Sequence, residues 1–361
     1  MFNLLTLNSD AFGLNISDLS IKIAKLKKQG KFFRLVCFGE TSLNPGVIEN
    51  GEIKNPQALI EAIKISIKNI KGETLKTNQV IASLPEEKAF AQMVLMPLMI
   101  EEELAQAIRF EAENYVPLPI NDVYLDFQVI KPLYNHLNYL DVLLTAISKK
   151  IVDEYLEVLE KSGLKVLVLE TESQAIARAL IKDHVSPIPV LIIDLGASRT
   201  SFMIFAGFSL RFSSFIPISQ ETLTSSVARS LNIDPKEAEN LKMKYGLGKN
   251  KKDVFGALIP VITDLLEQIK KHLSFYETHS NNHHLPSSDS RVQKVLLCGG
   301  GANLKGLAEF LSKYLALPVE LANPWINILP PCLKQIPLIP FEDSLRYATA
   351  LGLALRGQIH D

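Results

Sequence analysis

Hydrophobic and polar positions change their period several times along this chain, and each change marks an expected element. Residues 12–23, FGLNISDLSIKI, have the pattern of a strand, a tight turn and a second strand. The same pattern returns more strongly at residues 189–205, PVLIIDLGASRTSFMIF. Both hairpins run apolar, Asn or Asp, apolar, Ser or Gly, and then hydroxyl residues, which is a weak internal repeat. The repeat predicts two lobes that face each other across a cleft.

The rest of the pattern alternates short buried runs with apolar residues at helical spacing. Strands are expected at 32–40, 79–84, 139–148 and 165–173, and helices at 57–70, 101–114, 149–164, 174–183, 220–231, 235–244, 254–278 and 344–357. Residues 292–315 predict a buried strand, a triple-glycine turn and a helix. Strands interleaved with helices indicate an α/β protein. Residues 85–150 differ from their surroundings in the pattern of apolar and polar residues. Their two strands and two helices predict a small inserted α+β subdomain.

Composition narrows the class of protein. The 361 residues carry a net charge of -1, so the chain as a whole has no pull toward nucleic acid. The three cysteines, Cys37, Cys298 and Cys332, are far apart, which fits a reducing compartment without a disulfide framework or zinc ribbon. There is no signal-peptide pattern, and the longest apolar run, 89–100, is about half of a membrane span. We therefore expect a cytoplasmic protein.

Two glycine-containing turns have the chemistry of a phosphate site. A hairpin of small residues presents successive backbone N–H groups to phosphate oxygens, and an Asp at the strand end can hold Mg²⁺ through water. The second hairpin supplies these groups in Asp194, Gly196, Ser198 and Thr200. In CGGGANLKG, residues 298–306, three glycines after a strand let the backbone approach a ligand closely. Each turn alone is also compatible with an ordinary tight connection.

Along the chain come a hairpin, an insert, a second hairpin, helices and the triple-glycine turn. In this order they resemble the sequence of the actin-like ATPases, which include actin, DnaK-type chaperones, sugar kinases and FtsA. Within them the chain is most similar to the PilM family of type IV pilus assembly proteins, above all in EEELAQAIRFEAENYVPLP, residues 101–119. The resemblance implies a bilobed actin-like fold of two ribonuclease H-like lobes with a small α+β insert. The implied division is lobe 1 at 1–84, 151–187 and the C-terminal helix 342–361, the insert at 85–150, and lobe 2 at 188–218, 219–290 and 291–341.

The resemblance also implies ATP and Mg²⁺ as ligands and assigns residues to them. The first hairpin would contact phosphate through Asn15, Ser17, Ser20 and Lys22, and the second through Asp194, Gly196, Ala197, Ser198 and Thr200. Asp194 would lie near the metal and Glu172 would position a water, while Glu239, Lys242, Gly299, Gly300, Gly301 and Asn303 would surround the nucleoside. For Lys22, Glu172, Glu239 and Lys242, ordinary surface or helix-terminal roles remain open.

The first hairpin departs from the pattern of active relatives. They carry Asp-x-Gly where this chain has Asn15 and Ser17. An Asn supplies no negative charge to the water shell of magnesium, and a Ser adds a Cβ where Gly permits positive φ. We therefore predict weak or absent hydrolysis, with Glu172 and Asp194 as the only catalytic candidates and nucleotide as a structural or regulatory ligand.

The partner that the resemblance implies is the N-terminal cytoplasmic peptide of a PilN-like inner-membrane protein. The peptide would lie between lobe 1 and the insert, near Val94, Leu95, Met96, Leu98 and Met99, although for each residue alone the pattern favours a place in the core. Membrane association would be through this partner alone. The pilus motor ATPase and head-to-tail self-association are further candidate contacts, and nucleic acid is not expected.

Four alternative functions fit the sequence less well. An FtsA-like division polymer would carry an amphipathic membrane helix, which the final residues LRGQIHD do not form. An active actin-fold ATPase or kinase would carry an acid at position 15, and a DnaK-type chaperone would continue into a substrate domain after residue 361. His272, His279, His283 and His284 lack the paired spacing of a metal site.

Overall fold

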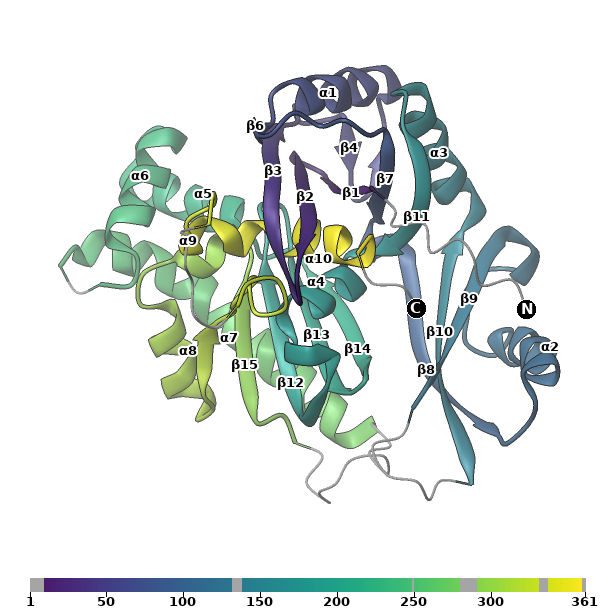
Figure 1. Cartoon of the computed structure of the whole chain (residues 1–361). Helices are drawn as coiled ribbons and strands as arrows, with labels where there is room; N and C mark the ends of the chain where they lie inside the picture. The colour runs from purple at the N-terminus through teal and green to yellow at the C-terminus, as the bar shows by residue number, and fades with distance from the viewer. Residues whose placement is uncertain (1–9, 132–137, 249, 280–290, 331–336, 359–361) are drawn as a thin grey trace.

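Two large sheets with the same strand order form the body of the molecule (Figure 1). The computed structural model describes residues 10–131, 138–248, 250–279, 291–330 and 337–358. The first sheet has the order β11-β7-β1-β2-β3-β6, with strands β1 Phe12–Ser17, β2 Ser20–Gln29, β3 Phe32–Ser42, β6 Lys71–Gly72, β7 Gln79–Leu84 and β11 Lys165–Thr171. Two short strands, β4 Ile48–Glu49 and β5 Glu52–Ile53, follow β3 in the chain and pair with each other.

The second sheet repeats this arrangement. Its order is β14-β13-β12-β15-β16, with strands β12 Ser186–Leu195, β13 Thr200–Gly207, β14 Ser209–Ile216, β15 Lys294–Cys298 and β16 Val319–Leu321. In each sheet three antiparallel strands, β1 to β3 or β12 to β14, are followed by two parallel ones on the far side of the first strand. The predicted internal repeat is therefore a repeat of topology, and the hairpins β1–β2 and β12–β13 occupy equivalent places.

Helices cover both sheets and separate them. They are α1 Pro56–Lys68 and α3 Lys149–Lys161 on the first sheet, α4 Glu172–Leu180 and α10 Ala348–Arg356 at the centre, and α5 Gln220–Leu231, α6 Pro235–Tyr245, α7 Lys252–His279, α8 Leu307–Leu315 and α9 Phe341–Ser344 in the second half. The two central helices touch so closely that a Cβ at Gly352 of α10 would lie 1.8 Å from the carbonyl oxygen of Ala175 in α4. Only glycine permits this crossing.

The insert is a three-stranded antiparallel sheet, β8-β10-β9, with helix α2 Glu101–Ala112. Its strands are β8 Ala89–Pro97, β9 Val123–Ile130 and β10 Tyr139–Ser148. It has a core of its own, in which Val94 and Met96 of β8 pack against Leu104 and Ile108 of α2. Because the insert has a core of its own, its pattern of apolar and polar residues can differ from that of the two large sheets.

The sequence pattern counted a helix at 149–164 with the insert, whereas the implied division placed residues 151–187 in lobe 1. The helix predicted at 149–164 is α3, and it packs on the core of the first sheet through Ile151, Tyr155 and Leu159. The missing third strand is β8, which lay unassigned inside the apolar run 89–100. Its inward Val94 and Met96 alternate with the more exposed Leu95, but Ala and Met blur this period.

Candidate functional site

A cleft of about 390 Å³ lies between the two hairpins. It brings together most of the residues predicted from the sequence, namely Asn15, Ser17, Ser20, Lys22, Glu172, Asp194, Gly196, Ala197, Ser198, Glu239, Gly299, Gly300 and Asn303. These residues come from both sheets and from α4, α6 and the turn after β15. The cleft therefore depends on how the two halves of the molecule face each other.

The first hairpin closes without glycine. Ser17 pairs with Ser20 at the end of the β1–β2 ladder, and its hydroxyl lies 3.0 Å from the carbonyl oxygen of Ser20. Ser17 is not one of the described residues with positive φ, so its Cβ causes no backbone strain. Lys22 donates to the Ser20 hydroxyl at 2.6 Å and lies 3.6 Å from a Glu40 carboxylate oxygen at the cleft wall.

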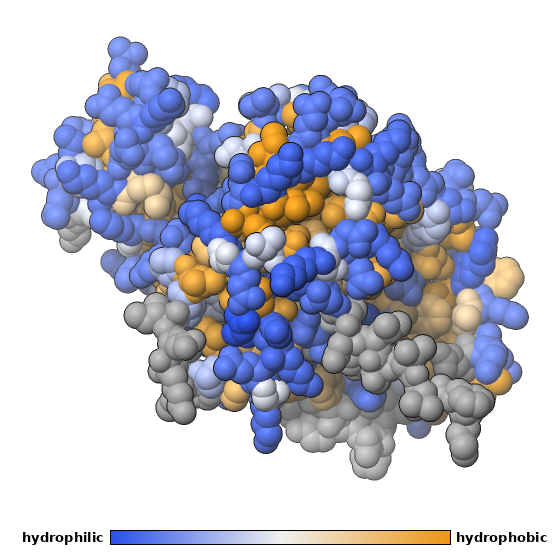
Figure 2. Space-filling model, turned by 45° about the horizontal axis from the view of Figure 1, so that its top comes forward, coloured by the Kyte–Doolittle hydropathy of each residue, from blue (hydrophilic) through white to orange (hydrophobic). Residues whose placement is uncertain are grey.

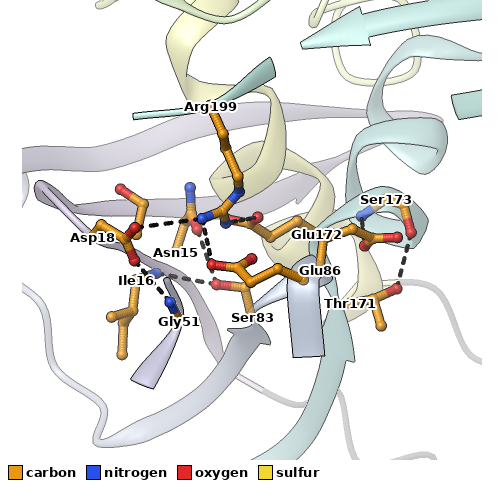
Figure 3. A network of polar contacts seen from close by, with 12 residues as sticks. Asn15, Ile16, Asp18, Gly51, Ser83, Glu86, Thr171, Glu172, Ser173 and Arg199 are labelled. Carbon is orange, nitrogen blue, oxygen red and sulfur yellow. Dashed lines mark hydrogen bonds and ion pairs between the residues drawn. The ribbon is translucent and has the colours of Figure 1, made fainter. Parts of the chain in front are cut away.

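Asn15 has a defined orientation at the base of this hairpin (Figure 3). The Ser83 hydroxyl accepts from the Ile16 N–H at 3.0 Å, so it donates its one proton to the Asn15 carbonyl oxygen at 2.9 Å. The Asn15 amide nitrogen consequently points away from Ser83, and Asn15 lines the cleft. A neutral donor thus stands where the resemblance to active actin-like ATPases implied a carboxylate.

The second hairpin keeps its acid. Asp194 ends β12 opposite Cys298 of β15, and a Cβ at Gly299 would lie 2.3 Å from its carboxylate oxygen Oδ1. Burial, reinforced by the nearby Glu172 charge, raises the pKa of Asp194 to about 6. Gly299 has a φ of +80°, so both its conformation and the space beside Asp194 require glycine. The triple-glycine turn therefore makes room for the acid of the neighbouring strand.

Arg199, which the sequence analysis did not single out, crosses between the two halves. From the β12–β13 turn its guanidinium reaches Glu87 at 2.6 Å, Glu172 at 2.8 Å and Asp18 at 3.7 Å (Figure 3). All four side chains are nearly buried. Asp18, Glu87 and Glu172 precede Arg199 by 181, 112 and 27 positions, so no local sequence pattern links them to it. Glu172 accepts from Arg199 through its oxygen Oε2 and lines the cleft, and the water-positioning role predicted for it stays a prediction.

At the nucleoside end, α6 presents one face to the cleft. Glu239 and Met243, four positions apart, line it, whereas Lys242 is buried and pairs with Glu239. The Lys242 ammonium also donates to the Thr224 hydroxyl at 2.8 Å, and burial lowers its pKa. Lys242 thus orients Glu239 from behind, in place of the direct contact predicted for it.

Two more predicted residues lie behind the cleft wall. Thr200 is fully buried, and its hydroxyl donates to the Ile218 carbonyl oxygen at 2.6 Å. Gly301 packs against the Leu195 side chain, which would meet a Cβ there at 2.4 Å. Asn303 lines the cleft while its amide donates to the Glu342 carbonyl oxygen at 2.8 Å. The sequence missed lining residues from distant segments, which include Leu19, Glu40, Ser42, Ser201, Gln220, Asp343, Leu345, Arg346, Ala348 and Thr349.

The histidines do not form a metal centre in the described part of the chain. His272 is stacked on Phe202, and its two ring nitrogens lie 2.7 Å from the Gln268 carbonyl oxygen and 3.1 Å from the Ser214 hydroxyl. The His279 side chain, His283 and His284 lie outside the described residues. Nor do the described residues contain a group of three or more His, Cys, Asp or Glu side chains arranged to hold a metal.

Comparison with known proteins identifies the family. The family profile described as type IV pilus assembly protein PilM matches residues 13–358. The chain belongs to the PilM family. A solved structure described as a PilM-PilN type IV pilus biogenesis complex superposes with a TM-score of 0.79 at 27% identity, over 97% of this chain and 99% of that one. The resemblance inferred from the two hairpins and residues 101–119 is confirmed.

More distant relatives place PilM within the actin-like fold. Cell division protein FtsA of Buchnera aphidicola subsp. Acyrthosiphon pisum (strain APS) is 23% identical over 333 residues, which span 81% of this chain and 79% of FtsA. MreB5 of Spiroplasma citri bound to AMPPNP has a TM-score of 0.55 at 12% identity, over 95% of this chain and 94% of MreB5. The predicted actin-like ATPase fold is thereby confirmed. Within the described residues, no helix is both long and apolar enough to cross a membrane.

Proposed function

We propose that this PilM-family protein is a nucleotide-responsive scaffold that hydrolyses ATP weakly or not at all. The observation that carries the proposal is the contrast at the cleft floor, where Asp194 is kept and Asn15 replaces the second acid. Backbone groups of the two hairpin turns and Lys22 would bind the phosphates of ATP, and Glu239 and Met243 would face the nucleoside. MreB5, which shares the fold, was solved with AMPPNP.

Magnesium fits the residues at this floor. The Asp194 side chain lines the cleft, and the glycine at position 299 leaves the space beside its oxygen Oδ1 free of a side chain. When bound, Mg²⁺ would neutralise phosphate charge, and Asp194 would hold it through water. Asn15 contributes a neutral N–H donor to the opposite wall, which suits phosphate oxygen better than a hydrated cation.

The proposed protein partner is the N-terminal peptide of a PilN-like inner-membrane protein. Support comes from the PilM-PilN complex, which is similar to this chain over its whole length. Of the five residues predicted beside the groove, Val94 and Met96 are core residues of the insert, whereas Leu95 is 42% and Leu98 60% exposed. Leu95 and Leu98 are therefore the better candidates for peptide contacts. The partner would bring the protein to the cytoplasmic face of the inner membrane.

Calorimetry with MgATP and with a synthetic peptide of the cognate PilN-like N-terminus tests the two ligands separately. We expect each to bind, and Asp194→Ala to weaken MgATP binding without loss of peptide binding. Leu98→Asp should weaken the peptide alone, with Phe341→Asp as a control for an exposed apolar residue away from the insert. If MgATP fails to bind, the nucleotide proposal is wrong. ATP turnover as fast as in active actin-like ATPases would refute weak hydrolysis.

A further inference from the structure

Arg199 sits at a junction between the cleft and the insert. It belongs to the second hairpin turn, residues 196–199, and it also lines the cleft. Its closest partner, Glu87, lies in the short helix η1 Glu86–Lys88, directly before β8 begins at Ala89. One side chain therefore connects the turn that would hold phosphate to the first strand of the insert.

The carboxylates around Arg199 outnumber the positive charge. One guanidinium faces Asp18, Glu87 and Glu172, and the second oxygen of Glu87, Oε2, is buried and has no hydrogen-bond partner among the described residues. Burial raises the pKa of Glu87 to about 7. Arg199 supplies most of the compensation for the desolvation of this carboxylate, because breaking a buried ion pair leaves the remaining charge unpaired. Glu87 is therefore the acid of the cluster that depends most on Arg199.

The other partners of the acids would remain in place if Arg199 moved. Asp18 accepts from the Gly51 N–H at 3.1 Å, and Glu172 begins helix α4, where the helix dipole favours a negative charge. The neighbour Glu86 is held separately, since it accepts from the Ser173 N–H at 3.1 Å. Only Glu87 would lose its ion pair without replacement, so the effect of the movement is directed to η1 and the start of β8.

A polyphosphate offers Arg199 a better partner. Guanidinium binds phosphate in the same bidentate manner as carboxylate, and a triphosphate carries more charge than any one acid of the cluster. The backbone of residues 196–199 and the Arg199 side chain line the same cleft, so a phosphate on the turn would lie within reach of the guanidinium. Phosphate and Glu87 would then compete for one cation.

We propose that Arg199 is a positioning residue that transmits nucleotide binding to the insert, because the triphosphate draws its guanidinium away from Glu87 and loosens the start of β8. The inference rests on the nucleotide-binding function proposed above and adds the direction of the coupling. In the unliganded chain the ion pair holds the insert against the second hairpin. Binding of the nucleotide releases residues 86–97, which carry the exposed Leu95 of the proposed peptide groove.

The two ends of the ion pair give opposite predictions. In Arg199→Gln the triphosphate loses its cation, so MgATP should bind about tenfold more weakly. In Glu87→Gln one acid that competes for the guanidinium is neutral, so MgATP should bind severalfold more tightly. A purely structural role would weaken binding in both variants, so a change in the same direction overturns the proposal. Arg199→Lys, which keeps the charge without the fork, should lie between wild type and Arg199→Gln and covers the case that Arg199→Gln does not fold.

Hydrogen exchange of residues 86–97, measured with and without MgATP, tests the transmission. In the wild type MgATP should raise exchange severalfold, whereas Arg199→Gln should exchange fast without nucleotide and show no further rise. Arg346→Gln is the matched control, because Arg346 lines the same cleft but pairs with Asp343 at 2.9 Å and Glu40 at 3.3 Å. It should weaken binding and keep the rise. If MgATP binds the wild type without changing exchange, the coupling is wrong and the nucleotide function stands. If calorimetry detects no binding, both are wrong.

Discussion

The two hairpins occupy equivalent positions in equivalent sheets, yet they differ in charge and in how their turns close. The first has Asn15 and Ser17 and is tied by side-chain hydrogen bonds among Ser17, Ser20 and Lys22. The second has Asp194 and Gly196, and its turn is closed by a backbone hydrogen bond of 2.9 Å from the Gly196 N–H to the Arg199 carbonyl oxygen. The difference shows that the hairpin shape does not require an acid at this position. We therefore expect phosphate binding and hydrolysis to be separable in this protein.

The largest effect is expected where the second hairpin is made like the first. Asp194→Asn replaces a carboxylate by an amide of the same shape and should weaken MgATP binding by about 2 kcal/mol, because the charged contact to magnesium water is lost. Binding of ATP in the presence of EDTA should change little. Titration calorimetry with and without magnesium checks this. Equal losses in both conditions would place the role of Asp194 in the fold and not at the metal.

The reverse exchange is expected to add activity. Asn15→Asp can keep the hydrogen bond from the Ser83 hydroxyl and direct its second oxygen into the cleft. ATP turnover should rise about tenfold above the wild type, since general base or electrostatic help from one carboxylate is of this order or greater. Single-turnover assays measure it, and the double variant with Asp194→Asn should abolish the gain. An unchanged rate would mean that Arg199, by binding Glu172, limits hydrolysis instead.

The pH dependence of stability should also separate the hairpins. The pKa of Asp194 is raised from 3.8 to about 6, so the folded state binds this proton more tightly than the unfolded chain. Its contribution is full below about pH 4 and is lost as pH rises to 6. Asp194→Asn should therefore be about 1 to 2 kcal/mol more stable than wild type at pH 7 and equal to it near pH 4. Urea unfolding at both pH values, without nucleotide, tests the sign, and Asn15→Ala serves as the control without a titrating group.

The smallest effects are expected in the turns themselves. Ser17→Gly loses a hydroxyl that lies 3.0 Å from the Ser20 carbonyl oxygen and should cost about 1 kcal/mol of stability, with MgATP affinity within about twofold of wild type. Gly196→Ala places a Cβ 2.9 Å from the Arg199 carbonyl oxygen and should cost a similar amount of stability but also shift Arg199. Thermal unfolding and calorimetry compare the two variants. A marked loss of affinity in Ser17→Gly would show that the first turn contacts the ligand through its hydroxyl.

How far the sequence reaches is clearest at particular residues. Asn15, Asp194 and Gly299 line one cleft, and the sequence brought them together because each lies at or just after the end of a strand whose pattern is visible locally and whose order matched a family. Lys242 and Thr200 were assigned to the ligand but lie behind the wall, since a helix turns its side chains by 100° per residue and the orientation of α6 and β13 depends on their packing. Met243 lies four positions after Glu239 and therefore on the same face of α6. This spacing would have predicted Met243 as a lining residue, but the sequence analysis did not include it.

Residue type, short-range periodicity and order along the chain were enough to establish the α/β class, the two hairpins, the family and the missing acid at position 15. The folded structure was needed to show that Arg199 pairs with Glu87 and Glu172 and that β8 completes the insert. Ion pairs across a cleft depend on the relative placement of two separately packed halves. That placement is set by contacts such as the crossing of α4 and α10 at Gly352, which leave no periodic mark in the chain.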